Sequence, residues 1–112
     1  MTKQQAFVLY LNEQAAWRTR KAAEDLEDLH NPRSAMALSM FARFVSSLPE
    51  DDSDLALLLN RLFFGKDGKI LAGDQVSDAV IRYGFDDAPK GSREFLQKLS
   101  IYALRDQEHF RE

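Results

Sequence analysis

The sequence predicts an all-α fold: a single helical domain over residues 1–112, a compact bundle of about five helices with orthogonal or irregular packing. Apolar residues recur at helical spacing, and no segment alternates convincingly between apolar and polar residues. The chain of 112 residues is close to the commonest domain size and can bury a core without disulfides or metals. Its composition, 45% hydrophobic and 29% charged, is typical of a globular protein.

The first helix is expected over about residues 3 to 29. With about 100° of rotation per residue, one set of its apolar side chains falls within an arc of about 60°. We expect this narrow stripe to face the core. Its members are Val8, Leu11, Ala15, Ala22, Leu26 and Leu29.

Two aromatic residues lie on the other side of this helix. Tyr10 and Trp17 point about 180° to 200° away from Val8, and Lys21 shares their side. A helix with one buried face would rarely expose the only tryptophan of the chain. Two explanations are open: the helix is enclosed on both sides, or Tyr10 and Trp17 anchor a contact with another chain.

The second helix is expected to begin at Asn31 as its N-cap, with Pro32 in the first turn, where a missing N–H costs nothing. It runs to about Leu48, and Pro49 stops it. We expect its core face to be widened by two methionines. The residues of this face are Ala37, Phe41, Phe44, Val45 and Leu48, with Met36 and Met40 beside them.

The third helix is expected over about residues 54 to 64. Leucines and phenylalanines cover most of its circumference, which predicts a central helix buried by its neighbours. Gly65 is expected to end it in the left-handed conformation. The next residues, "KIL" at 69–71, predict a short extended piece.

Two further helices complete the prediction. Asp74 is expected to cap a helix over about residues 75 to 83, which Gly84 stops while Phe85 packs back onto it. Ser92 is expected to cap the last helix, over about residues 93 to 109. This helix is expected to bury Phe95, Leu96, Leu99, Tyr102, Ala103 and Phe110.

The stretch "GKDGKIL", residues 65–71, joins two of these helices and resembles the calcium-binding loop of the EF-hand. If Gly68 takes the invariant glycine position of that loop, Phe63 and Gly65 fall where two of the oxygen ligands belong. Only Asp67 and Asp74 would then supply carboxylates. Since calcium needs more ligands than two, we expect a corner between helices and no metal site.

A longer stretch, "VSDAVIRYGFDDAPKGSREF" at residues 76–95, resembles the second helix-turn-helix of AraC-type transcription regulators. The resemblance lies in the Ala-Val pair at 79–80, the "GF" at 84–85 and the Ser-Arg-x-Phe opening at 92–95. It implies a DNA-binding segment, about residues 76 to 98, that contacts DNA through Lys90, Arg93 and Lys98. Gly91 replaces the aromatic residue of that family, and Pro89 lies where its recognition helix should begin.

Charge does not favour nucleic acid as the ligand. The whole chain carries a net charge of −3, with 15 basic and 18 acidic residues. Proteins that bind DNA derive much of their affinity from basic residues that neutralise phosphates. DNA binding is therefore the alternative prediction rather than the main one.

Composition also limits the compartment and the chemistry. The longest apolar run, "AFVLYL" at residues 6–11, is far shorter than the roughly 20 residues of a membrane span and is short for a signal peptide. We expect a cytoplasmic protein that does not enter membranes. Cysteine is absent, and neither His30 nor His109 has a neighbour that would form a nucleophile–base pair. We expect no enzyme activity and no cofactor.

The acidic run Glu50, Asp51, Asp52 and Asp54 precedes the third helix. Acidic residues there favour the positive end of the helix dipole and cap its unpaired N–H groups. Outer carboxylates remain available to a basic partner.

These observations predict a small non-catalytic protein that acts by binding another protein, as a regulator, adaptor or inhibitor. The expected contact residues are Tyr10, Trp17, Lys21, Glu50, Asp51 and Asp52. A long first helix with an aromatic second face also suits a homodimer with two-fold symmetry.

Overall fold

The computed structural model describes residues 1–110, with the side chains of residues 1–108. Its helices and strands, in chain order, are α1 (Lys3–Glu24), α2 (His30–Ser47), α3 (Ser53–Arg61), β1 (Phe63–Phe64), β2 (Ile70–Leu71), α4 (Asp74–Arg82) and α5 (Ser92–Phe110). The predicted class, an all-α bundle of about five helices, is confirmed. The predictions that concern the side chains of His109 and Phe110 lie outside the described side chains.

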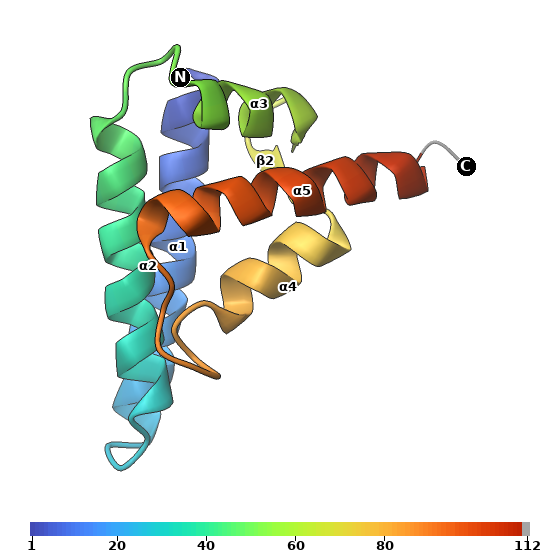
Figure 1. Cartoon of the computed structure of the whole chain (residues 1–112). Coiled ribbons are helices and arrows are strands. Elements are labelled where there is room, and N and C mark those ends of the chain that lie inside the picture. Colours follow the sequence, from blue (N-terminus) through green and yellow to red (C-terminus); the bar gives the residue numbers. More distant parts are fainter. Residues whose placement is uncertain (111–112) are drawn as a thin grey trace.

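The first two helices of the bundle, α1 and α2, form an antiparallel hairpin whose helices lie side by side (Figure 1). Phe7, Leu11 and Ala15 of α1 are buried at four-residue spacing against α2. The ring of Phe7 meets Phe41 edge-on, with 6.3 Å between centroids. The core face of α1 thus centres on Phe7 rather than on Val8, which is half-buried.

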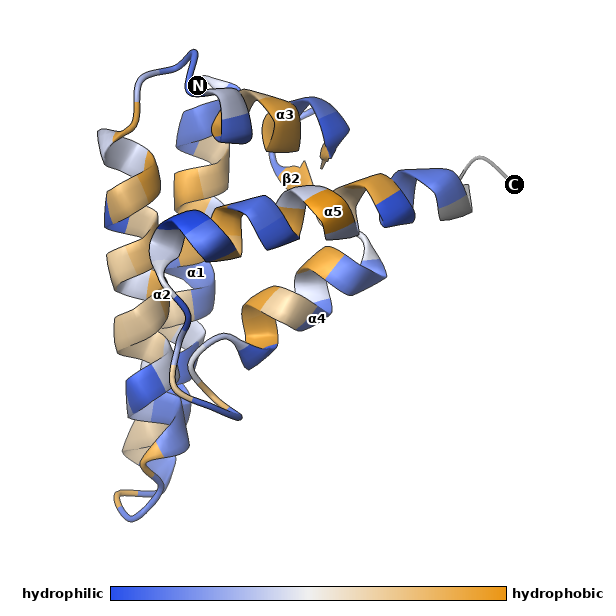
Figure 2. Cartoon of the chain, in the orientation of Figure 1, coloured by the Kyte–Doolittle hydropathy of each residue, from blue (hydrophilic) through white to orange (hydrophobic). Residues whose placement is uncertain are grey.

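The remaining helices cover one side of this hairpin, with α5 packed against both α3 and α4 (Figure 1). Three aromatic rings fill the centre. Tyr83 stacks on Phe95 with 3.8 Å between centroids, and Phe41 lies 4.8 Å from Phe95. Buried apolar residues of all five helices line this centre. Each helix carries both hydrophobic and hydrophilic residues along its length (Figure 2).

The first helix ends earlier than predicted, at Glu24, so the two leucines at its expected end, Leu26 and Leu29, are exposed. Aspartate side chains explain the break. Oδ1 of Asp25 accepts the backbone N–H of Glu27 at 3.1 Å, and Oδ1 of Asp28 accepts that of His30 at 2.9 Å. Such local bonds compete with the helical ladder.

The start and the width of α2 also differ from the prediction. Asn31 is not the N-cap, because the helix begins at His30 and Leu29 takes that position. Met36 and Met40 are exposed rather than part of the core. Met36 lies nine residues before buried Val45, which places it about 180° away around the helix.

The third helix ends at Arg61, and Phe63 and Phe64 form β1, which pairs antiparallel with the predicted extended piece at Ile70–Leu71. Gly65 therefore does not end the helix and is not left-handed; Gly68 is, with φ of 80°. Aromatic residues favour strands, and the Gly-rich turn closes this hairpin. The helix is not buried all round, since Leu57 is exposed.

The start of α4 is held by a side chain from another helix, and its end is set by a glycine. Asp74 is exposed and is not the cap; Asp106 of α5 accepts the backbone N–H groups of Gln75 and Val76 at 3.0 and 3.1 Å. The expected stop is confirmed, because Gly84 is left-handed with φ of 71°. The sequence predicts Ser92 as the cap of α5, at the position before the helix, but Ser92 is the first residue of α5.

Candidate protein-binding surface around Trp17

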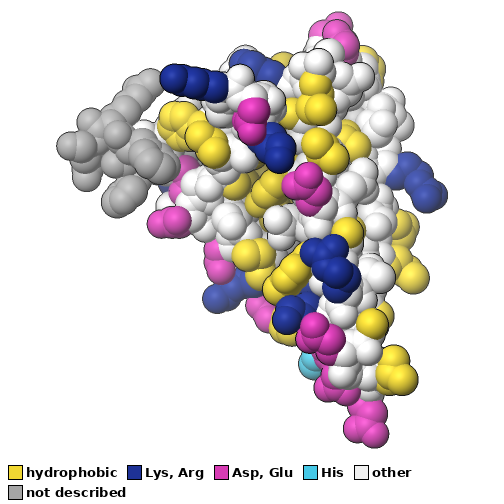
Figure 3. All heavy atoms as spheres, turned by 180° about the vertical axis from the view of Figure 1, so that it is seen from behind, with side chains coloured by type: hydrophobic (Ala, Val, Ile, Leu, Met, Phe, Trp, Pro, Cys, Tyr) yellow, Lys and Arg dark blue, Asp and Glu magenta, His cyan; other side chains and the backbone are white. Residues whose placement is uncertain are grey.

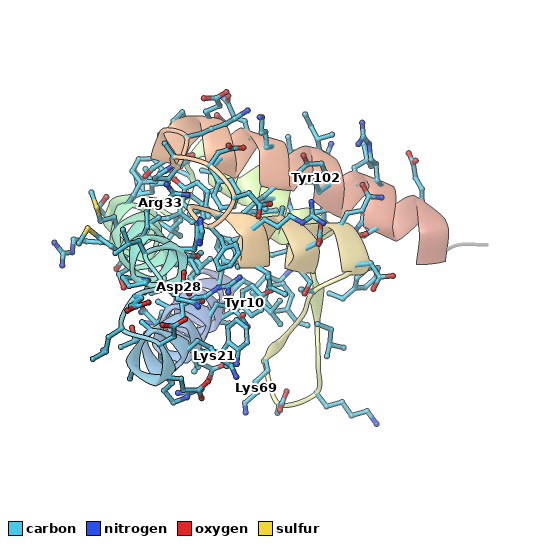
Figure 4. All side chains as sticks on the ribbon, turned by 90° about the horizontal axis from the view of Figure 1, so that it is seen from below. Tyr10, Lys21, Asp28, Arg33, Lys69 and Tyr102 are labelled. Atoms are coloured by element: carbon cyan, nitrogen blue, oxygen red, sulfur yellow. The ribbon has the colours of Figure 1, made fainter. Side chains whose placement is uncertain are left out.

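The aromatic face of α1 points toward α4, and its two aromatic residues have different environments. Tyr10 packs against the core and is half-buried, and its side chain hydrogen-bonds to Ser77 of α4. Burial raises the pKa of Tyr10 above its ordinary value. Figure 4 shows Tyr10 directed from α1 toward α4. Of the two explanations that the sequence left open, enclosure of α1 on both sides therefore applies at Tyr10.

Trp17 lies two turns further along the same face and is 37% exposed. The ammonium nitrogen of Lys21 lies 5.9 Å from the centre of the indole and 3.5 Å from the carboxylate of Glu24. Ile81 of α4 is also exposed. The indole therefore combines an apolar body with a cationic neighbour at the edge of the α1–α4 junction.

Arg18 holds this region together from within. Its guanidinium carbon lies 4.7 Å from the centre of the Trp17 ring and 4.4 Å from that of Phe85, so the two rings enclose it. It donates hydrogen bonds to Oδ1 of Asn31 at 2.8 Å and to the carbonyl oxygen of Ile81. We call Trp17, Lys21, Ile81 and Phe85 the Trp17 surface, because all but Lys21 directly adjoin Arg18.

Burial makes Arg18 an unusual arginine. It is only 6% exposed, and its Nε has no hydrogen-bond partner among the described residues. Loss of hydration lowers its pKa, while the charges of Asp28 and Asp86 act in the opposite direction. Sequence reasoning missed this residue, because arginines are rarely buried and nothing in the local pattern marked it.

The acidic corner is a separate feature, at the end of the hairpin where α1 begins, whereas Trp17 lies nearer the other end (Figure 1). Asp52 caps α3 by accepting the backbone N–H of Leu55 at 3.1 Å, so the predicted capping role is confirmed. Asp52 and Asp54 both pair with Arg93 at 2.9 Å. Glu50 and Asp51 are exposed, and their carboxylates lie outside this network of ion pairs.

Two of the three predicted DNA contacts, Lys90 and Arg93, lie close to acidic residues. Arg93 is engaged by Asp52 and Asp54, and Nζ of Lys90 lies 3.9 Å from Glu94. Lys98 lies beside Lys90, which lowers the pKa of Lys98. The connection between α4 and α5 spans residues 83–91, longer than the three or four residues of a helix-turn-helix turn. DNA binding stays a prediction.

An open groove of about 420 Å³ lies between α4, the 83–91 connection and α5. Its lining carries Arg82, Lys90 and Lys98 together with Asp78, Asp86 and Asp87. Arg82 pairs with Asp78 at 3.2 Å. Charges of both signs therefore balance around it, and the rim does not select one sign of ligand.

The described residues form neither a metal-binding cluster nor a membrane-spanning helix. No group of three or more His, Asp or Glu side chains among them could hold a metal ion. In the loop that resembles an EF-hand, Asp67 instead accepts the backbone N–H of Lys69 at 3.0 Å. Over the same part of the chain, every helix is too short or too polar to cross a membrane.

Comparison of the chain with known protein families, with curated proteins and with solved structures finds no match.

Proposed function

We propose that the protein acts by binding another protein, without catalysis, and that Trp17 anchors the contact. Its role would be that of a cytoplasmic regulator, adaptor or inhibitor. The observation that supports this is a tryptophan that is both partly exposed and held in place, since its ring lies against buried Arg18. Tryptophan, tyrosine and arginine are the residues most enriched among those that dominate binding energy at interfaces.

The fixed position of the indole matters for affinity. Arg18 is itself tied to α2 through Asn31 and to α4 through the carbonyl of Ile81. A side chain that is already ordered loses little conformational entropy when a partner covers it. Lys21, beside the indole, would favour a partner that places a carboxylate next to an apolar pocket.

Trp17→Ala tests this proposal, with Leu104→Ala on α5 as the matched control, because the two side chains are almost equally exposed. Each purified chain is used to capture interacting proteins from cells, and circular dichroism checks that each variant is folded. We expect proteins that are captured by the unchanged chain and by Leu104→Ala to be lost with Trp17→Ala. If folded Trp17→Ala captures the same proteins, the proposal is wrong.

A further inference from the structure

The outer side of α2 carries a second exposed apolar surface, away from Trp17. Leu29, at the N-cap of α2, is 76% exposed, and Met36 and Met40 are 67% and 61% exposed. Together with exposed Pro32 and Arg43 they fall within an arc of about 80° at 100° per residue. We call these five residues the Met stripe.

The figures place this stripe on the outside of the bundle. Seen from behind, hydrophobic side chains follow one another down the edge formed by the α1–α2 hairpin (Figure 3). In the view from below, sulfur atoms project outward from α2, away from the other helices (Figure 4). The side of α2 that faces the core is the opposite one, with Leu38, Phe41 and Val45 fully buried.

The two ends of the stripe carry opposite charges. Asp25 and Glu27 lie exposed in the turn just before α2, and Arg43 lies at the far end of the stripe. Among the described residues, neither Glu27 nor Arg43 has an ion-pair partner. The surface is therefore apolar in the middle, acidic at one end and basic at the other.

Such a surface is complementary to an inverted copy of itself. Two pairs of residues have nearly the same midpoint in the sequence, within one residue of each other and close to Met36. These pairs are Leu29 with Met40 and Glu27 with Arg43. A single two-fold axis near Met36 would thus bring leucine against methionine and acid against base at once. In a two-fold interface each of these contacts is made twice.

We propose that two copies of the chain form a dimer through the Met stripe, with α2 packed antiparallel against α2 of the partner. Leu29 then lies against the partner's Met40, and Glu27 lies near the partner's Arg43. A second copy fits better than a uniformly charged partner, because any such partner would meet a like charge at one end of the stripe. Methionine side chains adapt readily to the shape of an opposing surface.

The interface is one helix wide, which predicts a weak dimer. An interface between two single helices buries an area at the low end of the range for specific interfaces, below about 1,200 Å², and interfaces of that area are often transient. We expect a dissociation constant in the micromolar range. The Trp17 surface lies on the α4 side of the hairpin and stays exposed in the dimer, so dimerisation and partner binding are independent proposals.

Analytical ultracentrifugation of the whole chain from about 1 to 500 μM tests the dimer, since that range brackets weak interfaces. The mean mass is expected to rise from monomer toward dimer. Met36→Glu is expected to weaken the dimer at least tenfold, whereas Ile101→Glu, at a half-exposed position on α5, leaves it unchanged. A purely monomeric chain at the highest concentration, or equal effects of the two folded variants, would overturn the proposal.

Charge reversal tests the antiparallel arrangement. Glu27→Arg alone and Arg43→Glu alone each place like charges together and are expected to weaken the dimer severalfold. The chain that carries both changes is expected to recover the original dissociation constant, because both reversed charges then face each other. If the double variant dimerises more weakly than either single variant, as independent effects would give, the antiparallel register is wrong. Trp17→Ala is expected to leave the dissociation constant unchanged.

Discussion

Arg18 is a charged residue that the fold uses in its interior. The two rings on either side of it, Trp17 and Phe85, supply a flat apolar enclosure, and Phe85 in turn lies 5.2 Å from the ring of His30. Its two hydrogen bonds reach residues in α2 and α4. One side chain thus joins three helices, and the cost of burying its charge is reduced by cation–π contacts and hydrogen bonds.

Arg18→Met keeps much of the apolar contact but removes both donors. The amide oxygen of Asn31 and the carbonyl oxygen of Ile81 each lose a hydrogen bond from a charged group, and such a bond contributes about 1.5 to 3 kcal/mol. We expect the free energy of unfolding to fall by about that amount. Urea denaturation measures it, with Arg20→Met, at an exposed position of α1, as the control. A stability equal to that of the unchanged chain would contradict the clamping role of Arg18.

Asp52 links stability to pH. Its hydrogen bond from Arg93 holds the pKa of Asp52 below the ordinary value of 3.8, and the backbone N–H of Leu55 acts in the same direction. A carboxyl whose pKa is depressed by folding contributes stability above its ordinary pKa and loses it as the pH falls through the depressed value. The contribution is therefore complete at pH 7 and lost in acid.

Asp52→Asn isolates this contribution, since asparagine can still cap the helix. We expect the variant to be less stable than the unchanged chain at pH 7, and the difference to shrink below the ordinary pKa of 3.8. Urea denaturation at a series of pH values gives both curves. Asp51→Asn, at a neighbouring exposed position, is expected to follow the unchanged chain. Parallel curves for Asp52→Asn and the unchanged chain would rule out the linkage.

At the scale of the element, α4 is a short helix fixed at both ends by residues distant in sequence. The carboxylate of Asp106 lies at its N-terminus. Near its C-terminus, Arg18 donates a hydrogen bond to the carbonyl oxygen of Ile81. Just beyond it, Arg33 donates to the carbonyl oxygens of Gly84 and Phe85 at 2.7 Å. These signs match the helix dipole. A helix of nine residues is marginal alone, so its position depends on these contacts.

Asp106→Asn tests how strongly α4 depends on its distant cap. Asparagine offers one acceptor where the carboxylate offers two, and it carries no charge for the dipole. We expect a loss of about 1 to 2 kcal/mol, as for removal of an N-cap, and faster hydrogen exchange at the amides of Gln75 and Val76. Glu108→Gln, at an exposed position on the same helix, provides the control.

A glycine makes this cap possible. A Cβ on Gly73 would lie 2.4 Å from Cγ of Asp106, so Gly73→Ala is expected to displace the carboxylate. It should therefore reproduce the exchange pattern of Asp106→Asn. Unchanged exchange in both variants would show that α4 is held by its apolar face alone.

At the scale of the whole molecule, the charge distribution bears on the two functions that the sequence suggested. The net charge is −3, and Arg93, which the AraC-like resemblance assigns to DNA, joins α5 to the acidic residues at the start of α3. Its Cζ also lies 5.3 Å from the centre of the Phe44 ring. One of the three residues that the resemblance assigns to DNA is thus engaged in ion pairs within the fold.

Duplex DNA provides the corresponding test. We expect no change in the fluorescence anisotropy of labelled random-sequence DNA at about 100 μM protein, in salt of about 50 or 200 mM, because non-specific binding by a DNA-binding domain falls in the micromolar range and weakens steeply with salt. Affinity that falls with salt and is reduced by Lys98→Gln, but not by Lys3→Gln, would support the DNA-binding alternative instead.

The helical class, the number of helices, the extended piece at residues 69–71 and the stop at Gly84 could be predicted from the sequence, because spacing and turn chemistry act over a few residues. The sequence also singled out the face of Tyr10 and Trp17. The packing of the helices against one another encloses Tyr10 while Trp17 stays exposed, buries Arg18 and brings Asp106 to the start of α4. Those outcomes depend on contacts between helices far apart in the chain, such as Arg18 with Ile81, which the periodicity of a single segment does not encode.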